Sequence, residues 1–350
     1  MPVARRFLAP GPGSRLRPEA VSSPAIAARA VSLRQAPDLR TFLQVRYLET
    51  KGASAPEDVY YLHTNTYNTL QQLTRMTTVR EGGGGGTIMD MEYRFSAAQN
   101  NGRITQQKDW VSGEEVSYQY DSLQRLISAV TTGPEWGQSF TYDGFGNLLA
   151  KSVTKGSAPA LSVNVDGATN RITTAGFGYD ANGNLTAILG VSGVAYDGRN
   201  RLTAAGGDQY SYRPDNKRLW KKLPGGTEEL YFNSIRGERL GTYEPAVDGT
   251  ALYLKFKSTE VYFAGSLIRS QGQAVVLDRL GSVRSFGGTA MRYFPYGEEQ
   301  TSTPNGRPKF GTYYRDESTG LDYANQRYYG SGVGRFLTPD PYQGSAGAAD

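Results

Sequence analysis

The sequence contains no cysteine and only one histidine among its 350 residues. The absence of cysteine excludes disulfide bonds, thiol nucleophiles and thiolate ligands for a metal ion. A Ser-His-Asp triad would have to use His63, but this residue ends the run Tyr-Tyr-Leu-His, which has the pattern of a strand that leads into a turn. We therefore expect a structural role for His63, and we expect neither a metal ion nor another cofactor.

The chain also lacks long apolar runs and, beyond its first 40 residues, any excess of charge. No segment approaches the roughly 18 apolar residues of a membrane-spanning helix, and the N-terminus has no apolar signal-peptide core. Residues 1–40 hold seven arginines and two acidic residues, which accounts for the whole net charge of +5, whereas the other 310 residues balance 31 basic against 31 acidic side chains. Because a nucleic-acid binder carries a basic face on its folded part, we expect no nucleic-acid partner and no membrane span.

The feature that is present in abundance is a short motif with a tyrosine, an aspartate, a glycine or asparagine four residues after the tyrosine, and a leucine two residues later. The steps between copies vary from 14 to 28 residues. This irregular spacing excludes the fixed period of a propeller blade or of a calcium-binding solenoid. Clear copies begin at Tyr67, Tyr120, Tyr142, Tyr179 and Tyr196, and looser copies begin at Phe95, Val165 and Tyr212.

Each copy has the chemistry of a strand, a turn and a second strand. Aromatic residues alternate before the turns, as in Tyr118 and Tyr120 or Phe140 and Tyr142, so both rings face the same side of an extended strand. The aspartate can accept a hydrogen bond from the backbone two residues on, and the residue three positions after it must tolerate the left-handed conformation that closes a type I turn with a bulge. That position holds Gly146, Gly183 and Asn200. In two copies it holds Gln71 and Gln124, and glutamine is less favourable in this conformation.

These features predict an all-β fold, a long antiparallel strip of β-hairpins that is curved or partly spiralled. Tyrosine outnumbers phenylalanine 24 to 13, and it suits a half-buried face because its ring is apolar while its hydroxyl still needs a partner. We therefore expect one face rich in Tyr and Leu and one solvated face, with Tyr120, Tyr142, Tyr179 and Tyr196 on a common side.

Changes of composition divide the chain into five parts. Residues 1–40 combine six prolines with the seven arginines, which is typical of a disordered segment, and the run from Gly82 to Gly86 is typical of a flexible connector. The predicted parts are a disordered Pro/Arg-rich tail (1–40), a degenerate repeat with a glycine linker (41–90), the repeat strip (91–245), a C-terminal core region (246–341) and a flexible tail (342–350).

The Tyr-Asp motifs resemble the YD repeats of the RHS family, and the C-terminal block resembles the RHS repeat-associated core domain that closes such arrays. One Tyr-Asp motif is weak evidence, but the ordered run from Arg315 to Pro341 is highly specific, and the resemblance covers about residues 60–341. The matching segments of the core region are Asp-Arg-Leu-Gly-Ser-Val (278–283), Tyr-Gly-Glu (296–298), Phe-Gly (310–311), Arg-Asp-Glu-Ser-Thr-Gly-Leu-Asp-Tyr (315–323), Arg-Tyr-Tyr (327–329) and Gly-Arg-Phe-Leu-Thr-Pro-Asp-Pro (334–341).

The resemblance implies a β-strip that spirals into a hollow shell around a C-terminal toxic polypeptide, as in the C component of insecticidal Tc toxins and in RHS effectors of interbacterial competition. In such proteins the core domain plugs the shell and acts as an aspartyl autoprotease that releases the toxin. Carried over by position, the catalytic residues are Arg327 and Asp340. Two nearby carboxylates can share a proton, so that one acts as base and the other as acid, and a neighbouring arginine favours the charged form of one of them.

The chain departs from the family pattern after Pro341. The second aspartate of the family belongs to an Asn/Tyr-rich stretch that ends in Asp-Pro-x-Gly-Leu, whereas Tyr342 here begins a short segment rich in Gly and Ala that ends at Asp350. We therefore expect an incomplete site in a truncated shell segment that lacks its toxin.

Several of these residues also have a structural interpretation. Arg327 could pair with Asp316 or Asp322 and so pin the plug. For Arg335 and Glu298 we expect structural roles.

The sequence leaves three functions open. The first, which we favour over an enzyme, is a structural shell segment of a bacterial RHS polymorphic toxin, and it predicts an open strip or partial spiral with exposed edges. Its partners would be an enclosed toxin polypeptide and another shell protein or secretion component. Its location would be outside the cell or at the cell surface after specialised secretion, or the cytoplasm before export. The second function is an aspartyl autoprotease, and the third is a surface adhesin or carbohydrate-binding protein that uses Trp110, Trp136 and Trp220 as stacking platforms.

Overall fold

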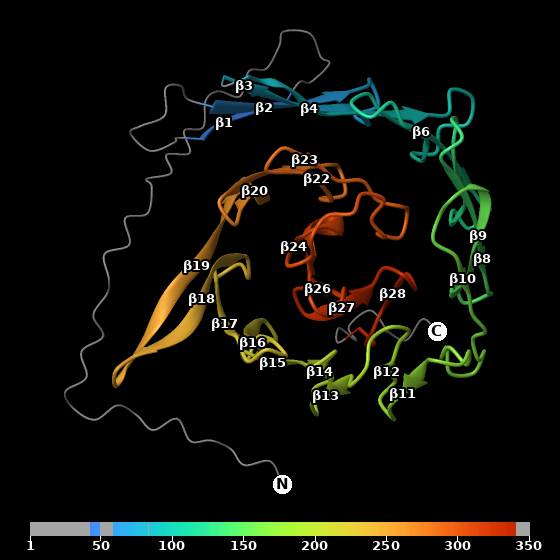
Figure 1. The fold of residues 1–350 in the computed structure, drawn as a ribbon. Helices are drawn as coiled ribbons and strands as arrows, with labels where there is room; N and C mark the ends of the chain where they lie inside the picture. The colour runs from blue at the N-terminus through green and yellow to red at the C-terminus, as the bar shows by residue number, and fades with distance from the viewer. Residues whose placement is uncertain (1–42, 50–58, 83, 341–350) are drawn as a thin grey trace.

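The computed structural model describes residues 43–49, 59–82 and 84–340, which form β-strands and one short 3-10 helix, η1 (Phe310–Thr312) (Figure 1). The all-β prediction is therefore confirmed. The two tails predicted at 1–40 and 342–350 lie outside the described residues. None of the described residues forms a helix long and apolar enough to cross a membrane.

Within each of the four sheets, every strand pairs antiparallel with its neighbours in the sequence, so each sheet is a simple meander. The first sheet contains β1 (Leu43–Glu49), β2 (Val59–Tyr67), β3 (Leu73–Glu81), β4 (Gly86–Phe95), β5 (Ile104–Asp109), β6 (Glu115–Tyr120), β7 (Leu126–Thr131), β8 (Trp136–Tyr142), β9 (Leu148–Gly156) and β10 (Leu161–Ser162). A small second sheet contains β11 (Gly178–Tyr179) and β12 (Leu185–Ala187).

The third sheet contains β13 (Ala195–Tyr196), β14 (Leu202–Ala205), β15 (Asp208–Tyr212), β16 (Arg218–Lys222), β17 (Glu228–Asn233), β18 (Arg239–Asp248), β19 (Ala251–Phe263), β20 (Ser266–Ser270), β21 (Gln273–Leu277), β22 (Val283–Phe286) and β23 (Thr289–Ala290). The last sheet contains β24 (Arg307–Pro308), β25 (Tyr314–Arg315), β26 (Asp322–Ala324), β27 (Arg327–Gly330) and β28 (Arg335–Phe336).

The turns of the array have the geometry that the motif predicts. In the copy at Tyr142, the backbone N–H of Gly146 donates to the carbonyl of Asp143 (3.2 Å), and one Asp143 carboxylate oxygen accepts from the backbone N–H of Phe145 and of Asn147 (2.9 Å each). The residue in the left-handed position has a positive φ in every clear copy, and the values are 60° for Gln71, 64° for Gln124, 85° for Gly146, 84° for Gly183 and 58° for Asn200.

The tyrosines of the motif bridge neighbouring repeats. The hydroxyls of Tyr120, Tyr142 and Tyr196 donate to the carbonyls of Ile104, Leu126 and Leu185, at 2.9, 2.6 and 2.6 Å respectively. The rings of Tyr142, Tyr179 and Tyr196 pack against buried clusters on the inner side of the strip. A half-buried tyrosine therefore satisfies its hydroxyl within the array while its ring contributes to the core.

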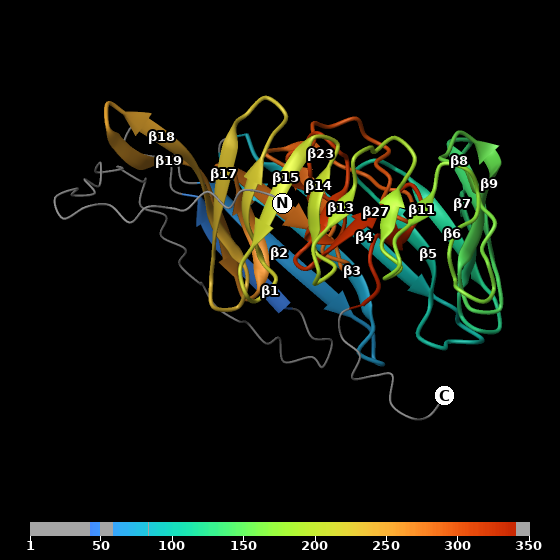
Figure 2. The ribbon, with the colours of Figure 1, turned by 90° about the horizontal axis from the view of Figure 1, so that it is seen from below.

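The strip curls into a spiral (Figure 1). Strands β1–β18, which we call the wall, form its outer turn. Strand β19 runs back along β18, and β20–β23 pass inside β2–β4. Residues 291–340, which we call the plug, lie innermost. The β18–β19 hairpin projects from the spiral (Figure 2). A partial spiral was one of the two shapes expected from the sequence.

The core of the molecule is made where the plug meets the wall. In the largest cluster the buried wall residues include Leu185, Leu202 and Tyr210, and the buried plug residues include Leu321, Tyr328 and Leu337. A second contact places Trp136 against Phe294, with ring centroids 5.2 Å apart. The plug is therefore packed into the wall, and the wall buries its inner apolar face against it.

The glycine run that was predicted as a connector lies at a hairpin turn. Gly82 and Gly84 have φ values of 83° and 77° and lie in the turn between β3 and β4, which pair as far as Arg80 and Gly86. The run therefore connects two strands of one hairpin. The predicted boundary between 245 and 246 falls within β18, where the sheet is continuous. The division into domains stays a prediction.

Candidate functional site

The structure brings the two predicted catalytic residues together. Arg327 lies in β27 and Asp340 is the last described residue, and their side chains form an ion pair with Nη2 3.1 Å from Oδ2. The Arg327 guanidinium also lies 3.9 Å from the centre of the Phe336 ring, which fixes its orientation. The Asp340 side chain remains 57% exposed, so water can reach its carboxylate.

A cavity of about 300 Å³ adjoins this ion pair, between the plug and the turns of the wall. Its wall side is formed by amide and guanidinium groups, from Asn182, Arg199 and Asn200 among others. Among the described residues that line it, Asp340 is the only carboxylate. Acid–base chemistry of the aspartyl type requires two carboxylates, and the described residues that line this cavity supply one of them.

The two aspartates suggested as structural partners of Arg327 pair with other residues. Asp316 pairs with Arg218, and Asp322 pairs with Arg315 through two bonds of 2.8 and 2.7 Å. Both carboxylates are fully buried, and burial raises the pKa of Asp322 despite the adjacent Arg315. Arg327 is consequently left to interact with Asp340.

The residues that do pin the plug form a buried polar cluster, which the sequence did not reveal. Arg218 of β16 donates through Nη1 to both Asp316 oxygens (2.9 and 2.8 Å) and to the Tyr328 hydroxyl (3.0 Å). Lys221 of the same strand lies 2.9 Å from Asp208 and 3.3 Å from Asp316. A network of buried charges thus crosses from wall to plug.

Tyrosine rings enclose Arg218. The guanidinium lies 4.4 Å from the ring centre of Tyr323 and 4.7 Å from that of Tyr231. Burial alone would lower the pKa of Arg218, but the charge of Asp316 outweighs it and the pKa is raised. The pKa of Tyr210 is also raised, by burial and then by the charge of Asp316, so its hydroxyl stays protonated and can donate.

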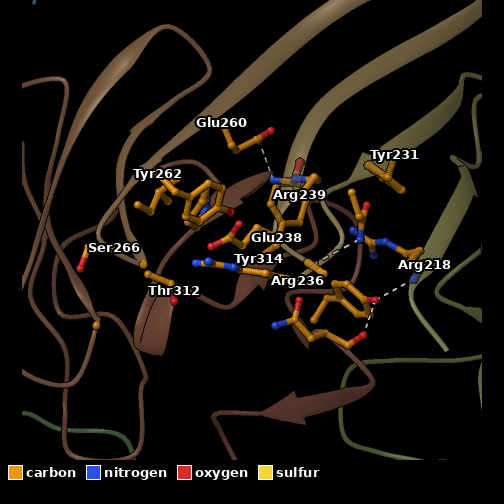
Figure 3. A pocket seen from close by; sticks show the side chains of 18 of the residues that line it. Arg218, Tyr231, Arg236, Glu238, Arg239, Glu260, Tyr262, Ser266, Thr312 and Tyr314 are labelled. Carbon is orange, nitrogen blue, oxygen red and sulfur yellow. Dashed lines mark hydrogen bonds and ion pairs between the residues drawn. The ribbon is translucent and has the colours of Figure 1, made fainter. Parts of the chain in front are cut away.

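A second cavity, of about 320 Å³, lies between β17–β20 and the plug (Figure 3). Arg239 and Glu260 form an ion pair of 2.9 Å at its inner end, and the Arg239 guanidinium stacks 4.1 Å from the Tyr314 ring centre. Arg236 and Glu238, from a wall turn, also line it. This arrangement offers polar and aromatic contacts, and no group of three or more metal-ligating side chains occurs among the described residues.

The remaining candidates have structural roles. His63 lies in β2 with Nδ1 2.9 Å from the Thr78 hydroxyl, and burial lowers its pKa, in agreement with the prediction. Glu298 forms a buried ion pair with Lys151. Arg335 donates to the Asn170 carbonyl (3.0 Å) and so ties plug to wall.

The adhesin hypothesis loses one of its three platforms. Trp136 is only 4% exposed and packs on the plug, so it cannot stack on a sugar. Trp110 is 48% exposed, but Lys108 lies 4.0 Å from its ring centre. The Trp220 indole N–H donates to Glu228 at 2.9 Å.

Sequence comparison finds two curated bacterial nucleases, although no family model matches the chain. The chain is 27% identical over 241 residues to the tRNA3(Ser)-specific nuclease WapA of Bacillus spizizenii, and 28% identical over 234 residues to the tRNA nuclease WapA of Bacillus subtilis strain 168. Each match covers 59% of this chain and 10% of the relative. The chain thus spans about one tenth of the length of these proteins.

Structural comparison finds crystal structures that contain TcdB2 and TccC3. The crystal structure of TcdB2-TccC3 superposes with a TM-score of 0.63 and 17% identity over 88% of this chain and 20% of that one. The structure of TcdB2-TccC3-Cdc42 gives a TM-score of 0.61 and 17% identity over 85% and 19%. The described residues therefore share the fold of a segment of that structure.

Proposed function

Because the chain is an RHS/YD-repeat protein with the fold of a toxin-shell segment, we propose that it contributes wall and plug to a container that encloses a toxic polypeptide. The observation that carries this proposal is the path of the chain, which wraps around its own C-terminal part (Figure 1). Asp340, the last described residue, pairs with Arg327 of the plug, which the wall surrounds. The role of the wall would then be to keep proteases away from whatever the container holds.

The contacts between wall and plug support this role. They combine apolar packing with buried ion pairs from distant parts of the sequence, such as Arg218 with Asp316 and Lys151 with Glu298. Removing one partner of a buried ion pair leaves an uncompensated charge and is strongly unfavourable. The plug is therefore held in one position, as a closure must be.

The partners follow from the same proposal. The solved complexes are named for TcdB2 and TccC3 together, and one of them also for Cdc42. For this chain we propose an enclosed polypeptide and a further shell segment as partners, and delivery outside the producing cell. The curated relatives are tRNA nucleases, and a nuclease is a cargo that its producer would need to keep enclosed.

Protease protection tests the container. An unstructured reporter polypeptide is fused after residue 350, and the same reporter is fused before residue 1 as the control. We expect the C-terminal reporter to be digested more slowly than the N-terminal one, and we expect Arg335→Ala to reduce the difference because Arg335 ties plug to wall. Equal digestion rates for the two reporters would contradict the proposal.

A second function, self-cleavage, is favoured by the ion pair between Arg327 and Asp340 beside a cavity. Asp340 would act as one carboxylate of an aspartyl pair, and the segment fused after residue 350 would carry the second in the Asp-Pro-x-Gly-Leu context of the family. We expect this fusion to release its C-terminal segment without added protease. Asp340→Asn should abolish the release, whereas the control Asp215→Asn should retain it. An intact fusion would argue against this function.

A further inference from the structure

The buried cluster contains a lysine and two carboxylates in direct contact. Lys221 Nζ lies 2.9 Å from Oδ2 of Asp208 and 3.3 Å from Oδ1 of Asp316. The side chains are 3%, 0% and 0% exposed respectively, so the three groups are closed off from solvent. Strand register explains the contact: Tyr210 of β15 lies opposite Lys221 of β16, and Asp208 is two residues from Tyr210 on the same face.

The two oxygens of Asp208 have different surroundings. Oδ2 accepts from Lys221, from the Tyr210 hydroxyl at 3.1 Å and from the Ser318 hydroxyl. Oδ1 is buried and has no hydrogen-bond partner among the described residues. Leaving one oxygen of a buried carboxylate without a hydrogen bond costs free energy. The same arrangement suits a carboxyl group that loses Oδ2 and keeps Oδ1 as the oxygen of an amide.

We propose that Lys221 and Asp208 condense to an isopeptide bond that links β16 to β15. Lys221 gives a proton to Asp316, and its neutral nitrogen then forms a bond to Cγ of Asp208. The bond from Cγ to Oδ2 breaks, and Oδ2 leaves as water with one proton returned by Asp316 and one from the attacking nitrogen. One ammonium and one carboxylate thus become one amide and one water, with no change in oxidation state.

Burial provides the driving force. The cluster holds two cations, Arg218 and Lys221, and two carboxylates, and keeping charges away from water is costly even when they are paired. Condensation removes Lys221 and Asp208 as charges and leaves Arg218 with Asp316, so the cluster is balanced before and after the reaction. Because the fold holds the two reacting groups in contact, the reaction does not require them to meet by diffusion.

The bond also depends on docking of the plug. Asp208 and Lys221 belong to the wall, whereas the proton acceptor Asp316 and the donor Ser318 belong to the plug. The wall would therefore be cross-linked only after the plug has taken its place, at the point where the two meet. This inference concerns the chemistry of the cluster and does not require that the molecule encloses a cargo.

Mass spectrometry of the full chain tests the proposal. The intact folded protein is expected to be lighter than its sequence by the mass of one water. Trypsin cleaves poorly between Arg213 and Pro214 and cannot cleave after an acylated Lys221, so the expected product is a branched peptide that joins residues 202–217 to residues 219–222. A folded protein that has the full mass calculated from its sequence would overturn the assignment. So would a branched peptide in which residues 219–222 are joined to residues 316–327 in place of 202–217.

Variants identify the groups that act. Lys221→Arg keeps the charge but removes the nucleophile, and is expected to show the full sequence mass, whereas the matched Lys222→Arg is expected to lose water as the wild type does. Asp316→Asn keeps the shape and removes the proton acceptor, and should slow bond formation by roughly 100-fold or more. Circular dichroism confirms that each variant is folded, and a folded Asp316→Asn that condenses at the wild-type rate would contradict the role of Asp316.

Discussion

At the scale of single residues, the molecule depends on a few charged side chains buried between wall and plug. Arg218 has 1% of its side chain exposed and satisfies Asp316, which has none. The two residues are 98 positions apart in the chain. Their pairing therefore stabilises the spiral and not the local hairpin.

We predict that Arg218→Met lowers the free energy of unfolding by about 3 kcal/mol, because it removes the guanidinium that pairs with the buried carboxylate of Asp316. The measurement is urea unfolding followed by circular dichroism. The control is Arg213→Met, whose ion pair with Asp215 is 36% and 47% exposed and should contribute no more than ~1 kcal/mol. Equal effects of the two substitutions would refute a special role for the buried pair.

Asp143 gives a prediction about pH. The side-chain amide of Asn147, and then the backbone N–H groups of the turn, lower the pKa of Asp143 in the folded protein. The stability that this carboxylate contributes is present above its unfolded pKa of about 3.9 and is lost as the pH falls through the folded value. Comparison of wild type with Asp143→Asn should therefore show a stability difference at neutral pH that shrinks on acidification. Asn68 fills the equivalent position in the first repeat, so asparagine fits there, and a pH-independent difference would rule out the ionisation of Asp143 as its cause.

At the scale of elements, the turn is the unit that the sequence specifies best. Its positive-φ position, its aspartate and its leucine all appear in the sequence, so the hairpins and their register could be predicted. Turns of the same geometry that begin at Leu223, Ser234 and Phe294 were not recognised, because no Tyr-Asp pair marks them. Their only local signal is a glycine three residues later, which is common in many loops.

Gln124 tests the turn geometry. It has a φ of 64°, which costs energy for a residue with a Cβ atom, so Gln124→Gly should raise the free energy of unfolding by about 0.5–1 kcal/mol. Arg103 donates to the Gln124 side chain on the exposed surface, and loss of that contact should cost little. Thermal unfolding provides the measurement, and Ser128→Gly in the middle of β7 provides a control that should be destabilising. A loss of stability in Gln124→Gly equal to that in Ser128→Gly would disprove the turn assignment.

At the scale of the whole molecule, the sequence predicted the strip, and the family resemblance named Arg327 and Asp340 as site residues. Neither indicated which parts of the strip come into contact when it curls into a spiral. The motif is local, and it carries no information about contacts between residues that lie far apart. Asp208, Lys221 and Asp316 therefore looked like ordinary charged residues of separate segments. Their only sequence signal is weak: Lys221 pairs in register with the inward-facing Tyr210, so a charge stands on the buried face of a strand.

The central claim is that residues 291–340 lie inside the turn formed by the wall, and site-specific photo-crosslinking tests it most directly. A photoreactive phenylalanine analogue replaces Tyr296, whose hydroxyl is 2.6 Å from that of Tyr142, or Tyr323, whose hydroxyl accepts from the backbone N–H of Arg218 at 2.7 Å. The account predicts intramolecular products that join position 296 to β8 or β9 and position 323 to β15 or β16. Products confined to the plug itself, with no bond to the wall from either position, would show that the strip does not close around its C-terminal part.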